Sequence, residues 1–204
     1  MPTAVLEPVA PPPLESVPHK KWTRAEIQDL TCKGFFAGEH YELIDGELIN
    51  KMGKFETHVN AVLLIQQWLV AIFGFLRVRK EEPIRVAADD DKDNEPEPDL
   101  VVLREPSPQM ARRPQPKDIL LAIEVADSTL RLDRTRKAEL YARADIPDYW
   151  ILDLQNRRMI VHRDPIGGKY TSIIAYAEHE SVSPLAAPQS EFRVGAAFAP
   201  TAER

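Results

Sequence analysis

The chain of 204 residues has one cysteine, no long uninterrupted hydrophobic run and no excess of basic residues. A single cysteine excludes an internal disulfide framework and a zinc site made of several cysteines, and we expect Cys32 to be packed within a helix. The apolar stretches are too short to cross a bilayer, and no basic segment followed by an apolar core marks a secretory signal. These absences predict a cytoplasmic protein with no membrane association.

The formal net charge of −6 argues against a protein that coats nucleic acids, because such proteins are normally basic. It does not exclude an enzyme that cuts them, since catalytic carboxylates count in the same sum. One segment is locally basic: between Arg131 and Arg143, five basic side chains accompany two acids. This segment could contact phosphates or form the solvated face of a helix, and both interpretations stay open.

The composition along the chain predicts a single domain between two tails. Residues 1–21 are crowded with prolines and poor in large apolar residues, so we expect them to be disordered. The domain should span residues 22–198, with a short tail at 199–204. The acidic run of residues 89–95 lacks the glycine and the closing glutamate of a calcium-binding loop, and we expect a solvated, mobile loop there.

Periodicity and capping signals predict the elements of an α/β fold with a mixed sheet. Thr23 and Glu26 form a capping box for a short helix over residues 23–33, and Asp45-Gly46 predicts a two-residue turn in a hairpin over 41–49. Further helices are expected at 55–73 and 132–144. Strands are expected at 76–79, 84–88, 99–104, 118–125, 149–154, 158–163 and 169–175, with Phe192 and Val194 in a candidate last strand.

Two carboxylates stand out because they belong to apolar strands. Asp99 follows a proline and begins the run Leu100-Val-Val-Leu103, while Glu124 lies within Ile119-Leu-Leu-Ala-Ile-Glu-Val125. An ionised carboxylate in such a strand is costly unless a cation compensates it. A divalent metal shared by the two acids, or a nearby lysine, would provide that compensation.

The next helix can supply the lysine. Asp133, Lys137 and Tyr141 are spaced four residues apart and share one helix face. Only a few residues separate this helix from the strand of Glu124, so Lys137 can fold back over the end of that strand. Two acids, a lysine and a metal together predict a site that cleaves phosphodiesters.

The same residues resemble the Uma family of the PD-(D/E)xK nuclease superfamily. The resemblance rests on Pro98-Asp99, on Ile123-Glu124-Val125, on the Asp133–Lys137–Tyr141 spacing, on the segments 41–48 and 146–153, and on His58. It covers roughly residues 22–180 and implies a restriction-endonuclease-like core, a central mixed sheet flanked by helices. The lysine of the superfamily usually lies two residues after the second acid, where this chain has Ala126, so the resemblance implies that Lys137 has taken over its role.

These expectations lead to a metal-dependent endonuclease that acts on DNA. Asp99, Glu124 and the Val125 carbonyl are hard oxygen donors suited to Mg²⁺ or Mn²⁺, and Lys137 would orient water or stabilise charge. The resemblance adds Glu47 and His58 as candidate catalytic residues, each weighed against a purely structural role. Double-strand cleavage usually needs two sites, which makes a homodimer plausible. The alternative is an inactive nuclease fold that binds a nucleic acid or a protein.

Overall fold

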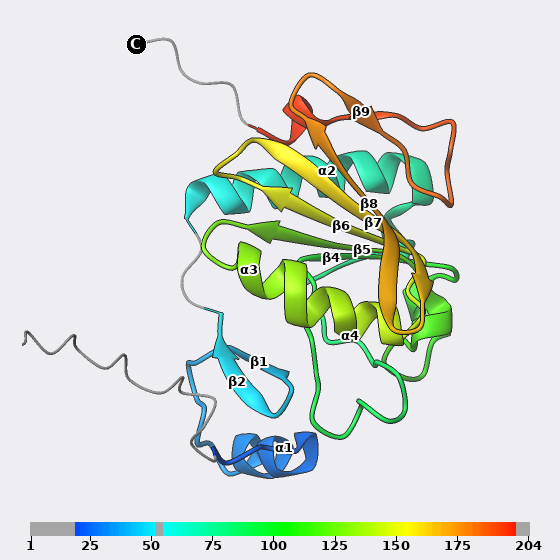
Figure 1. Cartoon of the computed structure of the whole chain (residues 1–204). Coiled ribbons are helices and arrows are strands. Elements are labelled where there is room, and N and C mark those ends of the chain that lie inside the picture. Colours follow the sequence, from blue (N-terminus) through cyan, green and yellow to red (C-terminus); the bar gives the residue numbers. More distant parts are fainter. Residues whose placement is uncertain (1–18, 52–54, 199–204) are drawn as a thin grey trace, which may run out of the picture.

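The computed structural model describes residues 19–51 and 55–198, and its centre is a six-stranded mixed sheet (Figure 1). All neighbouring strands are antiparallel except β5 and β6, which are parallel. The predicted mixed sheet flanked by helices is thereby confirmed. In order across the sheet, the strands are β3 (Val78–Lys80), β4 (Leu100–Leu103), β5 (Ile119–Ala126), β6 (Asp148–Asp153), β7 (Arg158–Ile166) and β8 (Lys169–Ala177).

A helical crossover connects the two parallel strands, as parallel pairing requires. It consists of α3 (Leu130–Leu132), the π-helical segment η5 (Asp133–Lys137) and α4 (Ala138–Arg143). The helix expected at 132–144 is thus present, but it begins two residues earlier. It also contains a π turn that the sequence pattern did not predict, and such turns are frequent at functional sites.

Helices cover both faces of the sheet, which explains why its central strands are apolar without alternation. The helix α2 (Glu56–Phe73) buries Ala61, Val62, Ile65 and Leu69 against one face. The helix α4 buries Leu140 and Tyr141 against the other face. Consecutive side chains of β6 belong to opposite cores, Tyr149 on the side of α4 and Trp150 on the side of α2.

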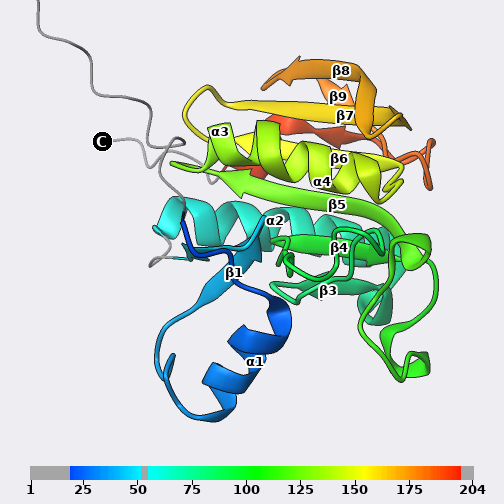
Figure 2. The same cartoon turned by 60° about the horizontal axis from the view of Figure 1, so that its bottom comes forward.

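The N-terminal hairpin lies beside the main sheet together with α1 (Arg24–Cys32) (Figures 1 and 2). Its strands β1 (Tyr41–Ile44) and β2 (Glu47–Asn50) form a separate two-stranded sheet. Asp45 and Gly46 both have positive φ, 49° and 74°, which confirms the predicted two-residue turn. The capping box of Thr23 and Glu26 is also present.

The acidic segment 89–95 holds this hairpin in place, so the prediction of a solvated, mobile loop is wrong. The buried Asn94 side chain accepts a hydrogen bond from the Asp45 amide at 2.7 Å. The Gly46 amide donates to the Asp93 carbonyl, and Leu43 exchanges two backbone hydrogen bonds with Glu95. Arginines from other segments neutralise the acids: Arg24 and Arg85 pair with Asp91, Arg143 with Asp90 and Arg113 with Glu95.

Several other local predictions need correction. Residues 84–88 form no strand, although Ile84 and Val86 are buried as a strand would require. Residues 76–79 divide between a 3₁₀ turn, η2 (Phe75–Arg77), and β3. Cys32 is exposed rather than packed. The candidate last strand is short: β10 (Phe192–Arg193) pairs with β9 (Ser181–Val182), and the 3₁₀ helix η6 (Val194–Ala197) follows.

The remaining segments complete the description. The loop between β4 and β5 contains two 3₁₀ turns, η3 (Ser107–Gln109) and η4 (Pro116–Asp118). Of the predicted tails, residues 1–18 and 199–204 lie outside the described residues. In the part of the chain that the structure describes, no helix is long and apolar enough to cross a membrane.

Candidate active site

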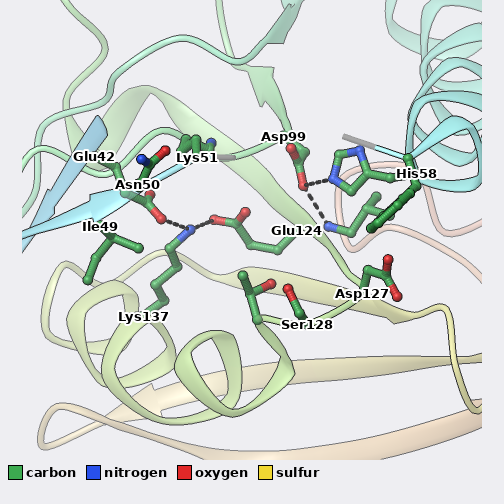
Figure 3. A pocket seen from close by; sticks show the side chains of 13 residues that line it. Glu42, Ile49, Asn50, Lys51, His58, Asp99, Glu124, Asp127, Ser128 and Lys137 are labelled. Atoms are coloured by element: carbon green, nitrogen blue, oxygen red, sulfur yellow. Dashed lines mark hydrogen bonds and ion pairs between the residues drawn. The ribbon is translucent and has the colours of Figure 1, made fainter. Parts of the chain in front are cut away.

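A cavity of about 270 Å³ opens where the hairpin, the start of α2, the adjacent ends of β4 and β5, and the crossover helix meet (Figure 3). Four residues predicted from the sequence line it: His58, Asp99, Glu124 and Lys137. Val125, predicted to contribute its carbonyl, lines it as well. Residues as far apart in the sequence as Glu42 and Lys137 thus meet in one pocket.

Asp99 reaches the cavity from the residue just before β4. Its side chain is only 5% exposed, and its Oδ2 atom accepts a hydrogen bond from the Val125 amide at 2.8 Å. This contact follows from the register of the sheet, in which Leu100 pairs with Ile123. The neighbouring strand therefore fixes the orientation of Asp99.

Glu124 enters the same cavity from within β5. Its Oε1 atom accepts hydrogen bonds from Lys137 Nζ at 2.9 Å and from the Tyr141 hydroxyl at 3.0 Å. Burial raises the pKa of Glu124 to about 8, because the attraction of Lys137 only partly offsets the loss of hydration, and nearby acids add repulsion. In the absence of a metal, Glu124 is therefore harder to ionise than an exposed glutamate.

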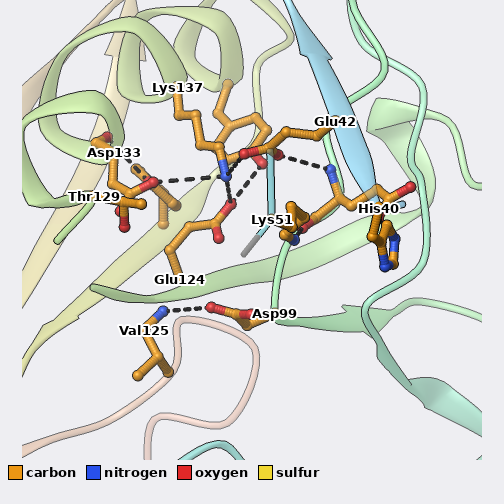
Figure 4. Close-up of polar contacts among 12 residues, drawn as sticks. His40, Glu42, Lys51, Asp99, Glu124, Val125, Thr129, Asp133 and Lys137 are labelled. Carbon is orange, nitrogen blue, oxygen red and sulfur yellow. Dashed lines mark hydrogen bonds and ion pairs between the residues drawn. The ribbon is translucent and has the colours of Figure 1, made fainter. Parts of the chain in front are cut away.

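Lys137 is the centre of the ionic network in this cavity (Figure 4). Its buried ammonium lies 2.8 Å from Glu42 Oε1, 2.9 Å from Glu124 Oε1 and 3.6 Å from Asp133 Oδ1. Burial by itself would lower the pKa of Lys137, but the surrounding carboxylates outweigh burial and raise that pKa well above its ordinary value. Lys137 is therefore a fixed positive charge and not a proton acceptor at neutral pH.

The π turn accounts for the position of Lys137. Asp133 and Lys137 begin and end the π-helical segment, and both side chains are buried. Asp133 Oδ2 accepts a hydrogen bond from the Thr129 hydroxyl at 2.6 Å, which ties the start of the segment to the loop after β5. Burial raises the pKa of Asp133, as it does for Glu124. The expected face of Asp133, Lys137 and Tyr141 is present and points at Glu124.

The hairpin contributes Glu42 to the site, whereas the sequence analysis had selected Glu47. Glu42 is 3% exposed, and its second oxygen, Oε2, accepts a hydrogen bond from the Glu97 amide at 3.3 Å. Glu47 lies outside the cavity, with a side chain that is 44% exposed and paired with Lys21 and Arg136. Those two cations lower the pKa of Glu47. The structure does not bring Glu47 to the other predicted residues.

One signal could have identified Glu42. The Asp45-Gly46 turn fixes the register of the hairpin and places Glu42 opposite Ile49. Both of those residues line the cavity. A glutamate opposite an isoleucine in a short hairpin indicates a face that is covered, and a covered acid needs a partner.

His58 lies in the first turn of α2, where it supports Asp99. Its Nε2 atom is 3.2 Å from Asp99 Oδ2, and the residue is buried. The other ring nitrogen, Nδ1, has no hydrogen-bond partner within residues 19–51 and 55–198. The geometry places His58 next to a candidate metal ligand.

The rim of the cavity carries a second ionic cluster. Lys51 lines the cavity and donates to the Glu97 carbonyl at 2.5 Å, while His40 Nε2 lies 2.6 Å from Glu97 Oε2. Burial raises the pKa of Glu97 despite these neighbouring cations. The cluster joins the outer end of the hairpin to the segment that leads to Asp99 (Figure 4).

The basic helix separates into two groups of side chains. Arg136 donates to Asp45, Glu47 and the Ile44 carbonyl, and Arg143 donates to Asp90 at 2.7 Å. These two arginines hold other parts of the protein. Arg131 and Arg134 are exposed, so phosphate contact by this helix stays a prediction for those two residues only.

The oxygen atoms of the cavity suit a small, hard cation. Asp99 and Glu124 line the same cavity from adjacent strands, and Mg²⁺ is commonly held by one or two carboxylates together with water and substrate oxygens. Among the described residues, no group of three or more His, Cys, Asp or Glu side chains is placed to hold a metal by itself. The donor set therefore fits a metal whose coordination is completed by a main-chain carbonyl, water or substrate.

Comparisons with known proteins agree with this fold. A crystal structure titled as a "putative nuclease belonging to DUF820" from Anabaena variabilis ATCC 29413 superposes with a TM-score of 0.60. It is 15% identical in sequence, and the match covers 78% of this chain and 89% of that chain. None of the curated proteins matches. The family model Uma2, described as "Putative restriction endonuclease", matches residues 24–196. Because the match extends over most of the sequence, the chain belongs to the Uma2 family.

Proposed function

We propose that this protein is a metal-dependent endonuclease that hydrolyses phosphodiester bonds in DNA. Family membership supports a nuclease function in general, and restriction endonucleases act on DNA. The observation that carries the proposal is the position of Lys137, whose ammonium lies 2.9 Å from Glu124 in the cavity that Asp99 also lines. Two acids and a lysine thus meet although the lysine comes from a helix.

Asp99, Glu124 and the Val125 carbonyl would hold Mg²⁺ or Mn²⁺. The bound metal would polarise a phosphoryl oxygen and lower the pKa of a coordinated water. The amide of Val125 orients Asp99, and His58 contacts the same carboxylate from α2. The chain thus supplies two oriented acids on neighbouring strands, which reduces the reorganisation needed when a cation binds.

Lys137 would act through its charge. Because the pKa of Lys137 is raised, its ammonium stays protonated and stabilises negative charge that develops on the phosphate. Glu42 and Asp133 would help to hold that ammonium in position. His58 would position Asp99, and Glu47, which pairs with Arg136 outside the cavity, would take no part in the reaction.

Cleavage of a supercoiled plasmid tests the proposal. Wild-type protein should nick or linearise the plasmid with Mg²⁺ or Mn²⁺ and stop when EDTA is added. Asp99→Asn should lose both cleavage and Mn²⁺ binding, whereas Lys137→Met should lose cleavage and keep Mn²⁺ binding. Glu139→Gln is the matched control, because Glu139 is exposed on the same crossover helix and should keep full activity.

Two results would overturn the proposal. One is a wild-type protein that leaves plasmid intact with either metal while circular dichroism shows it folded. The other is an Asp99→Asn variant that cleaves as fast as wild type. A folded wild-type protein that retards DNA in a gel without cutting it would support the alternative, an inactive nuclease fold that binds nucleic acid.

A further inference from the structure

The strand β8 leaves one edge of the main sheet open. Within residues 19–51 and 55–198, it is the last strand of the sheet and pairs with β7 on one side only. Figure 2 shows β8 at the border of the sheet, with β7 between it and the rest. Edge strands expose unpaired backbone N–H and C=O groups, which makes them templates for pairing with another strand.

The side chains of β8 increase this tendency. Ile173 is 55% exposed and Ile174 is 50% exposed. Since consecutive residues of a strand point to opposite faces, each face of the sheet carries one exposed isoleucine at the middle of this edge. Residues 170–177 include no charged residue, no proline and no glycine.

The opposite edge of the same sheet shows how an edge is normally protected. There, β3 has only three residues, and two of them, Arg79 and Lys80, are basic. Short length and charge are the usual means by which proteins prevent unwanted pairing. The strand β8 has nine residues, and its one charged residue is Lys169 at its start, so most of its edge has neither protection and is open to pairing.

We propose that β8 pairs antiparallel with β8 of a second copy of this chain, joining the two sheets into one. A two-fold axis at Ile173 would place the two Ile173 side chains together and the two Ile174 side chains nearby on the other face. In that register Lys169 lies opposite Ala177 of the partner copy, next to the position of an acidic residue, Glu178. Lys169 therefore lies near Glu178 of the partner copy, which also pairs with Arg157 of its own chain, and no like charges face each other across the paired strands.

The distribution of charged and apolar residues along β8 favours a second copy of this chain over a different protein as the partner. A self-complementary strand needs a centre without charge, and β8 has one: Lys169 begins the strand, and the acidic Glu178 only follows its last residue. A closed two-fold dimer also removes the edge completely, because each copy covers the other. Such a dimer would carry two cavities, one for each strand of a DNA duplex. The pairing itself does not depend on the proposed nuclease function.

The mass in solution tests the dimer. Sedimentation velocity of the full chain should give a mass near 46 kDa, twice 23.1 kDa, across a micromolar concentration series. Ile173→Lys should give the monomer mass, because two ammonium groups would meet at the axis. Leu63→Lys is the control, since Leu63 is 48% exposed on α2, far from this edge in sequence, and should stay dimeric.

A cross-linking experiment keeps the proposal testable if Ile173→Lys fails to fold. In a Cys32→Ser background, Ile173→Cys should form an intermolecular disulfide on mild oxidation, because opposite residues of an antiparallel pair are within disulfide range. Leu63→Cys in the same background should remain uncross-linked. A wild-type protein that is monomeric at every concentration, or a dimer that neither depends on Ile173 nor cross-links through it, would overturn the proposal. Neither readout depends on cleavage, so a failed nuclease assay would leave this test intact.

Discussion

Metal binding to this site should depend steeply on pH because a proton competes for Glu124. The pKa of Glu124 is about 8, and a divalent cation requires the ionised carboxylate. About 1% of a group with this pKa is ionised at pH 6, against about half at pH 8. If Glu124 is the only group that must lose a proton, the affinity for Mn²⁺ should therefore increase roughly 50-fold between these two pH values.

Isothermal titration calorimetry can measure both the affinity and the proton. Titrations of Mn²⁺ in two buffers with different ionisation enthalpies should show about one proton released per metal at pH 6 and about half a proton at pH 8. His58 needs a separate control because it contacts Asp99 in the same cavity. The His58→Gln variant should keep most of the pH dependence if Glu124 is its source.

The same proton affects the stability of the metal-free protein. The pKa of Glu124 is higher in the folded chain than its ordinary value of 4.5, so the folded state binds this proton more tightly than the unfolded state does. The resulting gain in the free energy of unfolding is fully present below pH 4.5 and is lost as the pH rises through 8. The loss is at most about 5 kcal/mol in the free energy of unfolding, since one pKa unit corresponds to about 1.4 kcal/mol. Millimolar Mn²⁺ should restore stability at pH 8 by binding the folded state.

Urea denaturation of wild type and Glu124→Gln completes the test. The variant cannot titrate at this position, so its free energy of unfolding should fall less between pH 5 and pH 8 than that of wild type. Equal Mn²⁺ affinity at pH 6 and pH 8, or an unchanged pH slope in Glu124→Gln, would refute the reasoning. Either result would mean that Glu124 is ionised in the folded protein at all these pH values.

Three further predictions concern the surroundings of the site. Lys137→Met should lower the free energy of unfolding, measured by urea denaturation at pH 7, by about 3–5 kcal/mol, because buried acids lose their cation. Arg134→Ala should change this free energy by less than about 0.5 kcal/mol. Glu42→Gln should slow plasmid cleavage about tenfold or more, because Lys137 would be held less firmly. Glu47→Gln should leave the cleavage rate unchanged. Equal rates for both variants would contradict the assignment of Glu42 to the site. Asn94→Ala should cost about 1–3 kcal/mol in thermal or urea unfolding, because the amide at the hairpin turn loses its acceptor, and an unchanged stability would contradict the anchoring role of Asn94.

Local signals predicted those parts of the fold that local forces determine. The Asp45-Gly46 turn and the capping box at Thr23 are decided by residues within a few positions of one another, and both are present. The apolar runs 100–103 and 119–125 predicted β4 and β5, because strands that are buried on both faces show no alternation of apolar and polar residues. The segment 84–88 has the same apolar character without being a strand, since Ile84 donates to the Pro96 carbonyl and finds no strand to pair with.

The errors arise where distant segments decide the structure. The acidic run was expected to be solvated because its own residues repel one another, yet the arginines that neutralise it come from four other parts of the chain. The choice of Glu47 over Glu42 has a similar origin. Both glutamates lie on the hairpin, and only the packing of the crossover helix against it decides which one meets Lys137 and which one meets Arg136.

The position of the lysine follows from the same packing. Residues 124 and 126 of β5 point to the same face of the sheet, so a lysine at 126 would project beside Glu124. In this chain Ala126 is completely buried in the core cluster that also contains Ala138 and Tyr141 of the crossover helix. Alanine at this position leaves room for the helix to pack closely over the strand, and that close packing brings Lys137 to within 2.9 Å of Glu124. The absence of a lysine at position 126 and the presence of one at 137 are therefore two consequences of one arrangement, in which the helix delivers the charge that the strand lacks.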